Sequence, residues 1–361
     1  MSRTGPRAAA LLGAAALLPL AFGPLSGFTG VCILALGYTV MALGLNVIVG
    51  FAGLLDLGYV AFFAIGAYTI GWLGSTFIAG VAGGRGWHVL VAGAAARMPG
   101  IHLNFGLVLV AAVALTTAAG VAIGVPTLRL RGDYIAVVTL AFGEIIGQLA
   151  HNGDQLQIAG QPLTAGPKGI TPIDSPSLPL AGDLPALNLR PWYWLALALA
   201  ALAVLVSCRL RDSRLGRAWR ALREDESVAA TLGIPVARTK LLAYGVGAAF
   251  GGTAGAFLGS FDNTVNADEF DFSFSILILG MVVVGGAGSI AGVVTGAVAL
   301  TFANYWLLPD VIQRLPFGTD LSQFSYGIYG FLLVATMLLR PRGVAPGHAP
   351  RELMLPSCLP T

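Results

Sequence analysis

The chain has 361 residues with a net charge of only +3; 56% of them are hydrophobic and 10% are charged. Because about a quarter of the residues in an ordinary soluble domain are charged, this composition excludes a soluble enzyme, a disordered protein and a charge-dependent nucleic-acid binder. The mean hydropathy of +0.81 means that a lipid bilayer must solvate much of the surface. The sequence therefore predicts an all-α polytopic membrane protein.

Apolar runs that approach the roughly 20 residues of a spanning helix follow one another along the chain. They are Ala8–Leu25, Gly30–Gly50, Gly58–Ala79, Phe105–Val125, Tyr134–Ala150, Trp192–Cys208, Leu241–Phe261, Phe274–Leu308 and Phe324–Leu339. The long eighth run contains Gly285, Gly286 and Gly288, which favour a helix hinge and split it into a broken or re-entrant pair. We therefore predict about ten transmembrane crossings. The first run lacks a convincing cleavage site, so we interpret it as a retained span and not as a signal peptide.

Basic residues near the span ends predict the orientation. They occur before the first span, at 129–131, throughout 209–240 and after the last span. With ten crossings, all four places lie in the cytoplasm, as the positive-inside rule requires. The proline-rich loop 151–190 is then extracytoplasmic. We expect a multi-pass protein of the bacterial inner membrane with both termini cytoplasmic, a membrane domain over 1–340 and a flexible tail over 341–361.

Two stripes of glycine recur at four-residue spacing, a pattern that lets membrane helices approach closely. They are Gly247, Gly251, Gly255 and Gly259 in the seventh span, and Gly288, Gly292 and Gly296 in the broken region. The favoured interpretation is helix packing inside one subunit. The alternative is that one stripe lines a subunit interface or a moving seam.

Few ionisable residues lie at membrane depth, and such residues are functional candidates because burying their charge in lipid is costly. Glu144 lies in the middle of the fifth span, where it faces a water-filled path, pairs with a partner chain or makes a buried structural hydrogen bond. Asp56 follows a glycine-rich turn and is interpreted first as a cap at a helix start. Together with the neutral Asn46 and Thr139, these residues form our hypothesis for a translocation path.

The sequence lacks the motifs of an enzyme. Cys32, Cys208 and Cys358 are far apart, and the four histidines are equally dispersed, so no metal-ligand spacing occurs. No G-x-x-x-x-G-K-[ST] phosphate loop, G-x-S-x-G elbow or H-E-x-x-H pair is present. We predict that the chain is not an enzyme and binds no metal or cofactor of its own.

The basic segment 209–240 has more structure than a simple loop. Leu215, Trp219 and Leu222 share one helical face, and the acidic run at 224–226 can cap a second short helix that Gly233 ends. Charge alone would make this segment only a marker of the cytoplasmic side. The spacing predicts a compact knob of two helices.

The residues of this segment resemble the coupling motif of ABC importer permeases, in the form Glu226-x-x-Ala229-Ala230-x-x-Gly233. Further blocks, such as Gly53-Leu54-Leu55-Asp56-Leu57-Gly58 and Leu130-Arg131-Gly132-Asp133-Tyr134, are similar to the branched-chain amino acid ABC permease family, LivM type. Over Thr164-Ala165-Gly166 the chain departs from the Thr-Gly-Gly that family members often show. The resemblance implies ATPase-coupling roles for Arg217, Arg220, Arg223, Glu224, Asp225, Glu226, Ala229, Ala230 and Gly233.

The resemblance also implies an assembly. It consists of a second, LivH-like permease subunit, two cytoplasmic subunits that bind ATP and Mg, and an extracytoplasmic solute-binding protein. Leucine, isoleucine and valine are the implied solutes, moved into the cytoplasm by alternating access. Relatives that carry urea or amides, and a sister class that carries pentoses, remain compatible with the sequence. The alternatives from other classes are a stand-alone secondary transporter or channel, in which Glu144 relays ions, and a structural membrane scaffold.

Overall fold

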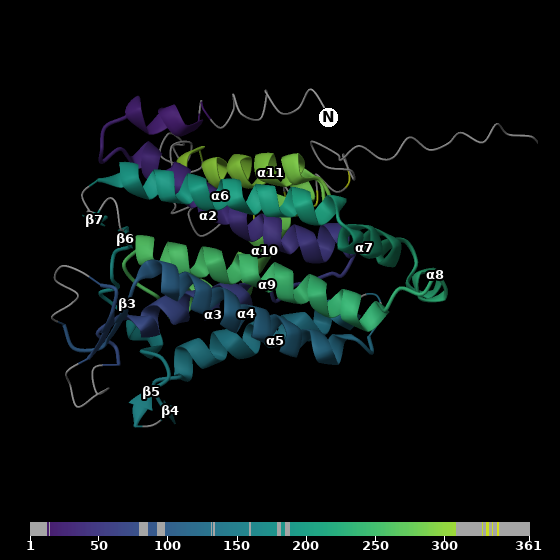
Figure 1. The fold of residues 1–361 in the computed structure, drawn as a ribbon, viewed down its shortest axis with the longest axis horizontal. Helices are drawn as coiled ribbons and strands as arrows, with labels where there is room; N and C mark the ends of the chain where they lie inside the picture. Colours follow the sequence, from purple (N-terminus) through teal and green to yellow (C-terminus); the bar gives the residue numbers. More distant parts are fainter. Residues whose placement is uncertain are drawn as a thin grey trace, which may run out of the picture.

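The computed structural model describes residues 13, 15–78, 86–91, 98–130, 132, 134–158, 160–178, 182–184, 188–307, 327, 330–331, 334 and 338. Over these residues the protein is a bundle of helices whose axes are roughly aligned (Figure 1). The predicted tail 341–361, most of the predicted last span and the start of the first lie outside the described residues.

Five helical segments of the described chain are long and apolar enough to cross a membrane. They are α2 (Gly27–Leu45) with the π-helical turn η2 (Asn46–Phe51), α4 (Phe105–Thr127), α5 (Tyr134–Asn152), α6 (Leu189–Asp212) and α9 (Val236–Phe261). Each matches a predicted span. Polar caps set two of the starts, since Asn104 accepts from the amide of Gly106 and Asn188 from that of Arg190.

Three apolar helices are shorter than a bilayer-spanning length. They are α3 (Val60–Leu73), α10 (Phe272–Gly285) and α11 (Ile290–Phe302), the last continued by the π-helical turn η7 (Ala303–Leu307). The predicted span Gly58–Ala79 is thus shorter as a helix, because Gly74–Ser75 pairs with another strand. The predicted hinge separates α10 from α11: Gly285 ends α10, and Gly288 adopts a φ of 90° in the turn. The total of ten crossings remains a prediction.

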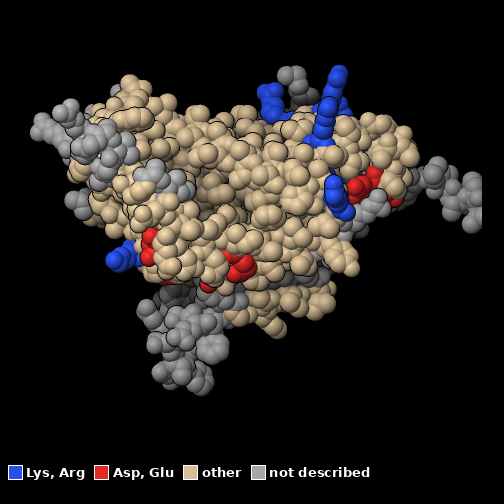
Figure 2. Space-filling view, turned by 90° about the horizontal axis from the view of Figure 1, so that it is seen from below, with Lys and Arg blue, Asp and Glu red and all other residues tan. Residues whose placement is uncertain are grey.

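Short strands gather at one end of the bundle, opposite the end that carries the helices of segment 209–240 (Figure 1). The sheet order is β1 (Gly74–Ser75), β3 (Ile101–Leu103) and β2 (Trp87–Val89), and two hairpins pair β4 (Gln157–Ile158) with β5 (Gln161–Pro162) and β6 (Ser177–Leu178) with β7 (Gly182–Asp183). The predicted loops 151–190 and 209–240 therefore lie at opposite ends. In Figure 2 most Lys and Arg side chains gather towards one end, and the middle of this face is largely uncharged.

The glycine stripes bring helix backbones together inside this chain. A Cβ atom on Gly251 would lie 2.9 Å from Cβ of Phe62, and one on Gly255 would lie 2.8 Å from the amide nitrogen of Ala67, both on α3. A Cβ on Gly296 of α11 would lie 2.8 Å from Cα of Gly285 on α10. These contacts confirm the favoured interpretation that the stripes pack helices within one subunit.

Candidate functional site

Segment 209–240 forms the predicted two-helix knob, made of α7 (Arg214–Glu224) and α8 (Glu226–Thr231). Asp225 caps α8, because its Oδ1 accepts from the amides of Ser227 and Val228 at 2.7 and 3.1 Å. The Ser227 hydroxyl and these two amides hold the pKa of Asp225 below its usual value. Gly233 has a φ of 80° beyond the end of α8. The acidic cap and the terminating glycine are both confirmed.

The knob is fixed to the first turns of α9 by two buried side chains. Trp219 is fully buried, and its indole nitrogen donates to the carbonyl oxygen of Thr239 at 2.9 Å. Lys240 is 1% exposed, and its ammonium donates to both carboxylate oxygens of Glu226 at 2.9 Å. Glu226 therefore binds within its own chain. Lys240 was not among the predicted coupling residues, although its spacing of four residues to the buried Tyr244, and three more to Gly247 of the glycine stripe, could have placed it on the interior face.

Arg223 connects the knob to both helix interruptions. Its guanidinium donates to the carbonyl oxygen of Gly50 in η2, and a Cβ on Gly53 would lie 2.6 Å from Cγ of Arg223. Oδ1 of Asn46 accepts from the amide of Gly288 at 2.7 Å, which joins η2 to the turn between α10 and α11. Asn46 and the predicted hinge are thus brought together beside Arg223.

The remaining predicted coupling residues are mostly on the surface of the knob. Ala229 is buried, while Arg217, Arg220, Glu224, Asp225, Ala230 and Gly233 are exposed. Two apolar side chains are also exposed there, Val228 by 52% and Leu232 by 72%. An exposed apolar surface rimmed by charges is typical of a protein-binding site.

Asp56 and Thr139 hold the loop before α3 against α5. Oδ1 of Asp56 accepts from the amide of Gly58 at 2.9 Å, and Oγ1 of Thr139 accepts from the amide of Leu57 at 3.1 Å. Both side chains are almost completely buried. The interpretation of Asp56 as a helix-start cap is wrong, because α3 begins only at Val60 and has no side-chain cap. Asp56 instead stabilises the turn that precedes the helix.

Glu144 differs from the other three residues of the translocation hypothesis. Asn46, Asp56 and Thr139 are buried, whereas Glu144 is exposed on α5. It lines a shallow groove of about 410 Å³ together with Ile145, Gln148, Leu149 and Asn152. The structure therefore brings Asp56 and Thr139 together at one turn and places Asn46 and Glu144 elsewhere, with only Glu144 exposed.

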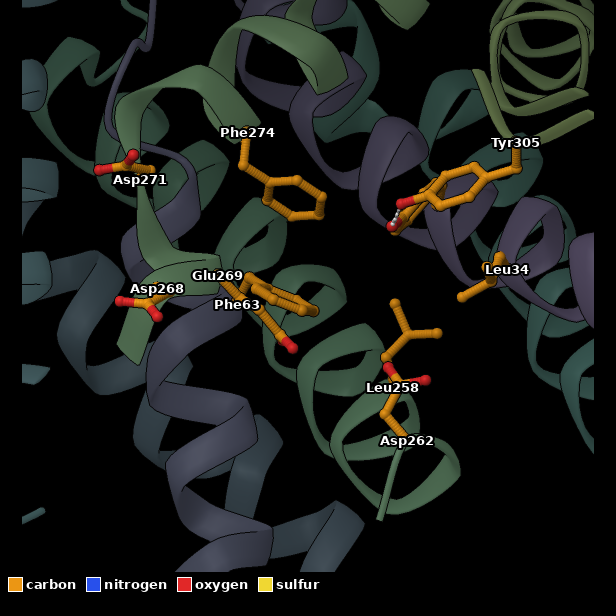
Figure 3. Close-up of a pocket in the computed structure, with 10 residues that line it drawn as sticks. Leu34, Phe63, Leu258, Asp262, Asp268, Glu269, Asp271, Phe274 and Tyr305 are labelled. Atoms are coloured by element: carbon orange, nitrogen blue, oxygen red, sulfur yellow. Dashed lines mark hydrogen bonds between the residues drawn. The ribbon is translucent and has the colours of Figure 1, made fainter. Parts of the chain in front are cut away.

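A cavity of about 370 Å³ lies between α2, α3, α9, α10, η7 and the 3-10 helix η6 (Ala267–Phe270). Figure 3 shows acidic and aromatic side chains approaching it from these elements. They are Asp262, Asp268, Glu269, Asp271, Tyr38, Phe63, Phe274 and Tyr305, and the described lining includes no Lys or Arg. The hydroxyls of Tyr38 and Tyr305 are 2.9 Å apart.

The acidic side chains of this cavity influence one another. Burial, followed by the charges of Asp262 and Asp268, raises the pKa of Glu269 to about 7. Burial raises the pKa of Asp262 to about 6. Sequence reasoning missed this site, although the dense run of four acids within 262–271, directly after an apolar span, was an available signal.

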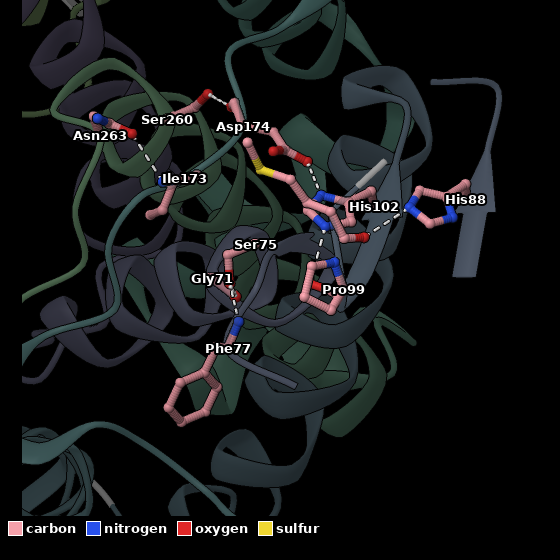
Figure 4. A network of polar contacts seen from close by, with 11 residues as sticks. Gly71, Ser75, Phe77, His88, Pro99, His102, Ile173, Asp174, Ser260 and Asn263 are labelled. Atoms are coloured by element: carbon pink, nitrogen blue, oxygen red, sulfur yellow. Dashed lines mark hydrogen bonds and ion pairs between the residues drawn. The ribbon is translucent and has the colours of Figure 1, made fainter. Parts of the chain in front are cut away.

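A polar network ties the strand-rich end together (Figure 4). The buried His102 contacts Asp174 with an Nδ1–Oδ2 distance of 2.6 Å, and the ring of His88 stacks on that of His102 with centroids 5.3 Å apart. Ser260, at the end of α9, donates to the carbonyl oxygen of Asp174. Two histidines that are 14 residues apart in the sequence, His88 and His102, are therefore adjacent. Among the described residues, no group of three His, Cys, Asp or Glu side chains could hold a metal ion.

Comparisons with known proteins agree on one family. The family model described as "Branched-chain amino acid transport system / permease component" matches residues 27–337. The high-affinity branched-chain amino acid transport system permease protein LivM of Escherichia coli is 34% identical over 345 residues, covering 90% of this chain and 71% of the relative. The probable LivM permease of Methanocaldococcus jannaschii is 24% identical, covering 86% and 90%.

A second type of relative matches a shorter part of the chain. The LivH permease protein of Salmonella typhimurium is 31% identical over 151 residues, covering 42% of this chain and 45% of the relative. No solved structure matches the chain significantly. Since the family model covers most of the sequence and the LivM relatives align along it, the chain belongs to the branched-chain amino acid transport permease family.

Proposed function

We propose that this protein is the membrane-spanning subunit of an ATP-binding-cassette importer that moves branched-chain amino acids, or a related small solute, into the cytoplasm. The observation that carries the proposal is the knob of α7 and α8. It is fixed to the bundle on one side and exposes Val228 and Leu232 on the other. A chain without a nucleotide-binding loop needs such a surface to receive force from a separate ATPase.

The proposed assembly has two permease subunits, two ATPases that bind ATP and Mg, and a solute-binding protein. The knob docks on an ATPase in the cytoplasm, while the strand-rich end faces outward and receives the binding protein. The presence in E. coli of both LivM and LivH permease proteins, each similar to this chain, supports a permease partner of the LivH type. We place the complex in the bacterial inner membrane, with ten crossings and both termini of this chain cytoplasmic.

The contacts of the knob suggest how movement reaches the solute. Lys240 and Thr239 tie the knob to the start of α9, and the other end of α9 contributes Leu258 and Asp262 to the acidic cavity. The helix between Lys240 and Asp262 is about 33 Å long at 1.5 Å per residue. When an ATPase displaces the knob, α9 and the interruptions held by Arg223 move together, and the cavity changes shape at the far end of α9.

The chemistry of the cavity fits a solute with an ammonium group. Carboxylates provide a negative potential, and the faces of Phe63, Phe274 and Tyr38 favour a nearby cation. A volume of about 370 Å³ lies in the range of small-molecule sites. An amino acid with an apolar side chain can therefore place its ammonium near Asp262 or Glu269 and its side chain against the aromatic rings.

The proposal is tested with the complex reconstituted in vesicles, together with its ATPases and binding protein. Val228→Ser and Leu232→Ser should weaken retention of the ATPases and reduce ATP-driven leucine uptake. For ATPase retention, Leu156→Ser is the matched control, because Leu156 is 47% exposed but lies at the end of the bundle opposite the knob. Uptake that continues when the ATPases are omitted would contradict the proposal and favour a stand-alone secondary transporter.

A further inference from the structure

We propose that the exposed polar face of α5, made of Glu144, Gln148 and Asn152, packs against a second, non-identical permease subunit. The inference rests on the proposed function, which requires such a partner, and it assigns the place where the partner binds. The three residues lie four positions apart and therefore share one helix face. All three are exposed, and the side-chain amide of Asn152 donates to the side-chain oxygen of Gln148 at 3.2 Å.

The position of Glu144 along α5 makes lipid an unsuitable neighbour. The helix runs from Tyr134 to Asn152, so Glu144 lies about 12–15 Å from each end at 1.5 Å per residue. Placing a charged side chain at such a depth in lipid is unfavourable on insertion scales. Within the described chain no cation contacts this carboxylate. Something other than hydrocarbon must therefore cover it.

Neighbouring helices show what a lipid-facing surface looks like in this protein. Helices α4 and α6 are about as exposed as α5, but at membrane depth they expose no polar side chain, whereas α5 exposes Glu144 and Gln148. Val110 and Leu115 on α4 and Leu202 and Leu205 on α6 are between 46% and 67% exposed. Lipid tails can cover those faces without cost. The polar face of α5 is the exception among these three helices and is the one that needs a protein neighbour.

The shape of the face also fits a helix from another chain. The groove of about 410 Å³ has an almost entirely apolar floor, and Glu144, Gln148 and Asn152 are among the residues that line it. Helices in membranes associate through close packing of such surfaces together with interhelical hydrogen bonds from polar side chains. An occupant at this depth must itself span the membrane, and the permease partner is the member of the proposed assembly that does so.

A non-identical partner fits better than a second copy. A two-fold axis beside this face would bring equivalent Glu144 carboxylates into the same seam, where like charges oppose one another. A distinct subunit can instead present a hydrogen-bond donor. One edge of this face of α5 meets η6, which lines the acidic cavity, with the partly exposed His151 and Asp268 3.3 Å apart and the carbonyl oxygen of Phe270 close to Gly147. Movement at the interface is thereby passed to the cavity.

Site-specific photo-crosslinking in the assembled complex tests the interface. Ile145, 51% exposed in the groove, and Leu202, 57% exposed on α6, are replaced one at a time by p-benzoylphenylalanine. Illumination should join position 145 to a different permease chain, identified by mass spectrometry, with at least a tenfold lower yield from position 202. A product at 145 that contains only lipid, a second copy of this chain or any non-permease subunit overturns the inference.

Two further variants distinguish a specific loss of the interface from a general effect of changing an exposed helix. Gln148→Leu keeps most of the side-chain volume and removes the hydrogen-bonding group, so it should lower the yield of the co-purified permease partner several-fold. Val110→Ser, a polar change on α4, should leave that yield unchanged. ATP-driven leucine uptake by the parent complex is measured in parallel. Absence of uptake refutes the proposed function, whereas the crosslinking result decides the interface independently.

Discussion

The bond between Glu226 and Lys240 offers the most quantitative test of how the knob is held. The Lys240 ammonium is 1% exposed, and both carboxylate oxygens of Glu226 lie 2.9 Å from it. Removing one partner of a fully buried ion pair costs about 3–5 kcal/mol because the remaining charge is uncompensated. The Glu226 side chain is 32% exposed, so water partly compensates, and we expect Glu226→Gln to cost about 2–3 kcal/mol.

Removing the other partner of the ion pair, Lys240, should cost less stability. Lys240→Met keeps the aliphatic stem in place, and the partly exposed Glu226 can recruit water, so we expect a loss of about 1 kcal/mol. In the double variant no buried charge is left alone. Its loss should therefore fall below the sum of the two single losses by about 1–2 kcal/mol, which is the coupling energy of the pair.

The stability of the parent protein, the two single variants and the double variant is measured by thermal unfolding in detergent. A thiol-reactive dye follows the transition, because it labels the buried Cys32 on unfolding. Cys208 and Cys358 are replaced by serine throughout to remove their background. Asp212→Asn serves as the control, because the Arg211–Asp212 pair is exposed and should contribute little. Strictly additive losses for Glu226→Gln and Lys240→Met would refute the claim that this pair anchors the knob.

Three other predictions follow from the same structure. Arg223→Ala should leave ATP hydrolysis by the complex intact but reduce uptake at least tenfold, whereas Arg211→Ala, in an exposed pair at the end of α6 and outside the knob, should change neither; a proportional loss of both activities would contradict the link through Arg223. Gly255→Ala should destabilise the protein by about 1–3 kcal/mol, because the new Cβ would lie 2.8 Å from an α3 backbone nitrogen, while Gly30→Ala, which meets nothing within 4 Å, should be neutral in the same melting assay. The raised pKa of Glu269, about 7 against an ordinary 4.5, means that the folded chain holds this proton more tightly than the unfolded chain. Its contribution to stability is complete below about pH 4.5 and is lost as the pH rises through about 7, so Tm should fall over that window, and Glu269→Gln should flatten the decline.

The sequence was sufficient for the elements whose signals are local. Apolar runs located α4 and α9 to within a few residues, and the knob was predicted from helical spacing, an acidic cap and a terminating glycine. The acidic cavity and the pair of stacked histidines required knowledge of which distant segments meet. Asp262 and Tyr305, for example, line the same cavity only because α9, α10 and α11 fold back on one another.

In the coupling motif of segment 209–240, the sequence did not show which side chains lie on the surface and which contact the interior. Glu226 and Arg223 belong to a pattern associated with docking, yet both bind groups of their own chain. The sequence pattern could not separate these residues from Arg217 or Glu224, because all are charged residues on two short helices. Whether such a side chain contacts its own chain or faces outward depends on the positions of α9 and of the turn after α10. These positions are a property of the tertiary packing.

The shortness of α3 has a consequence for biosynthesis. Its 14 residues span about 21 Å, less than the roughly 30 Å of the hydrocarbon core, and it packs extensively on α9, which begins about 160 residues later. At 5–20 residues per second, the ribosome needs roughly 8–30 s to synthesise the intervening chain. During that delay α3 has no permanent partner for the face that later meets the glycine stripe. The insertion machinery must hold or shield this helix, and the bundle closes only when α9 is delivered.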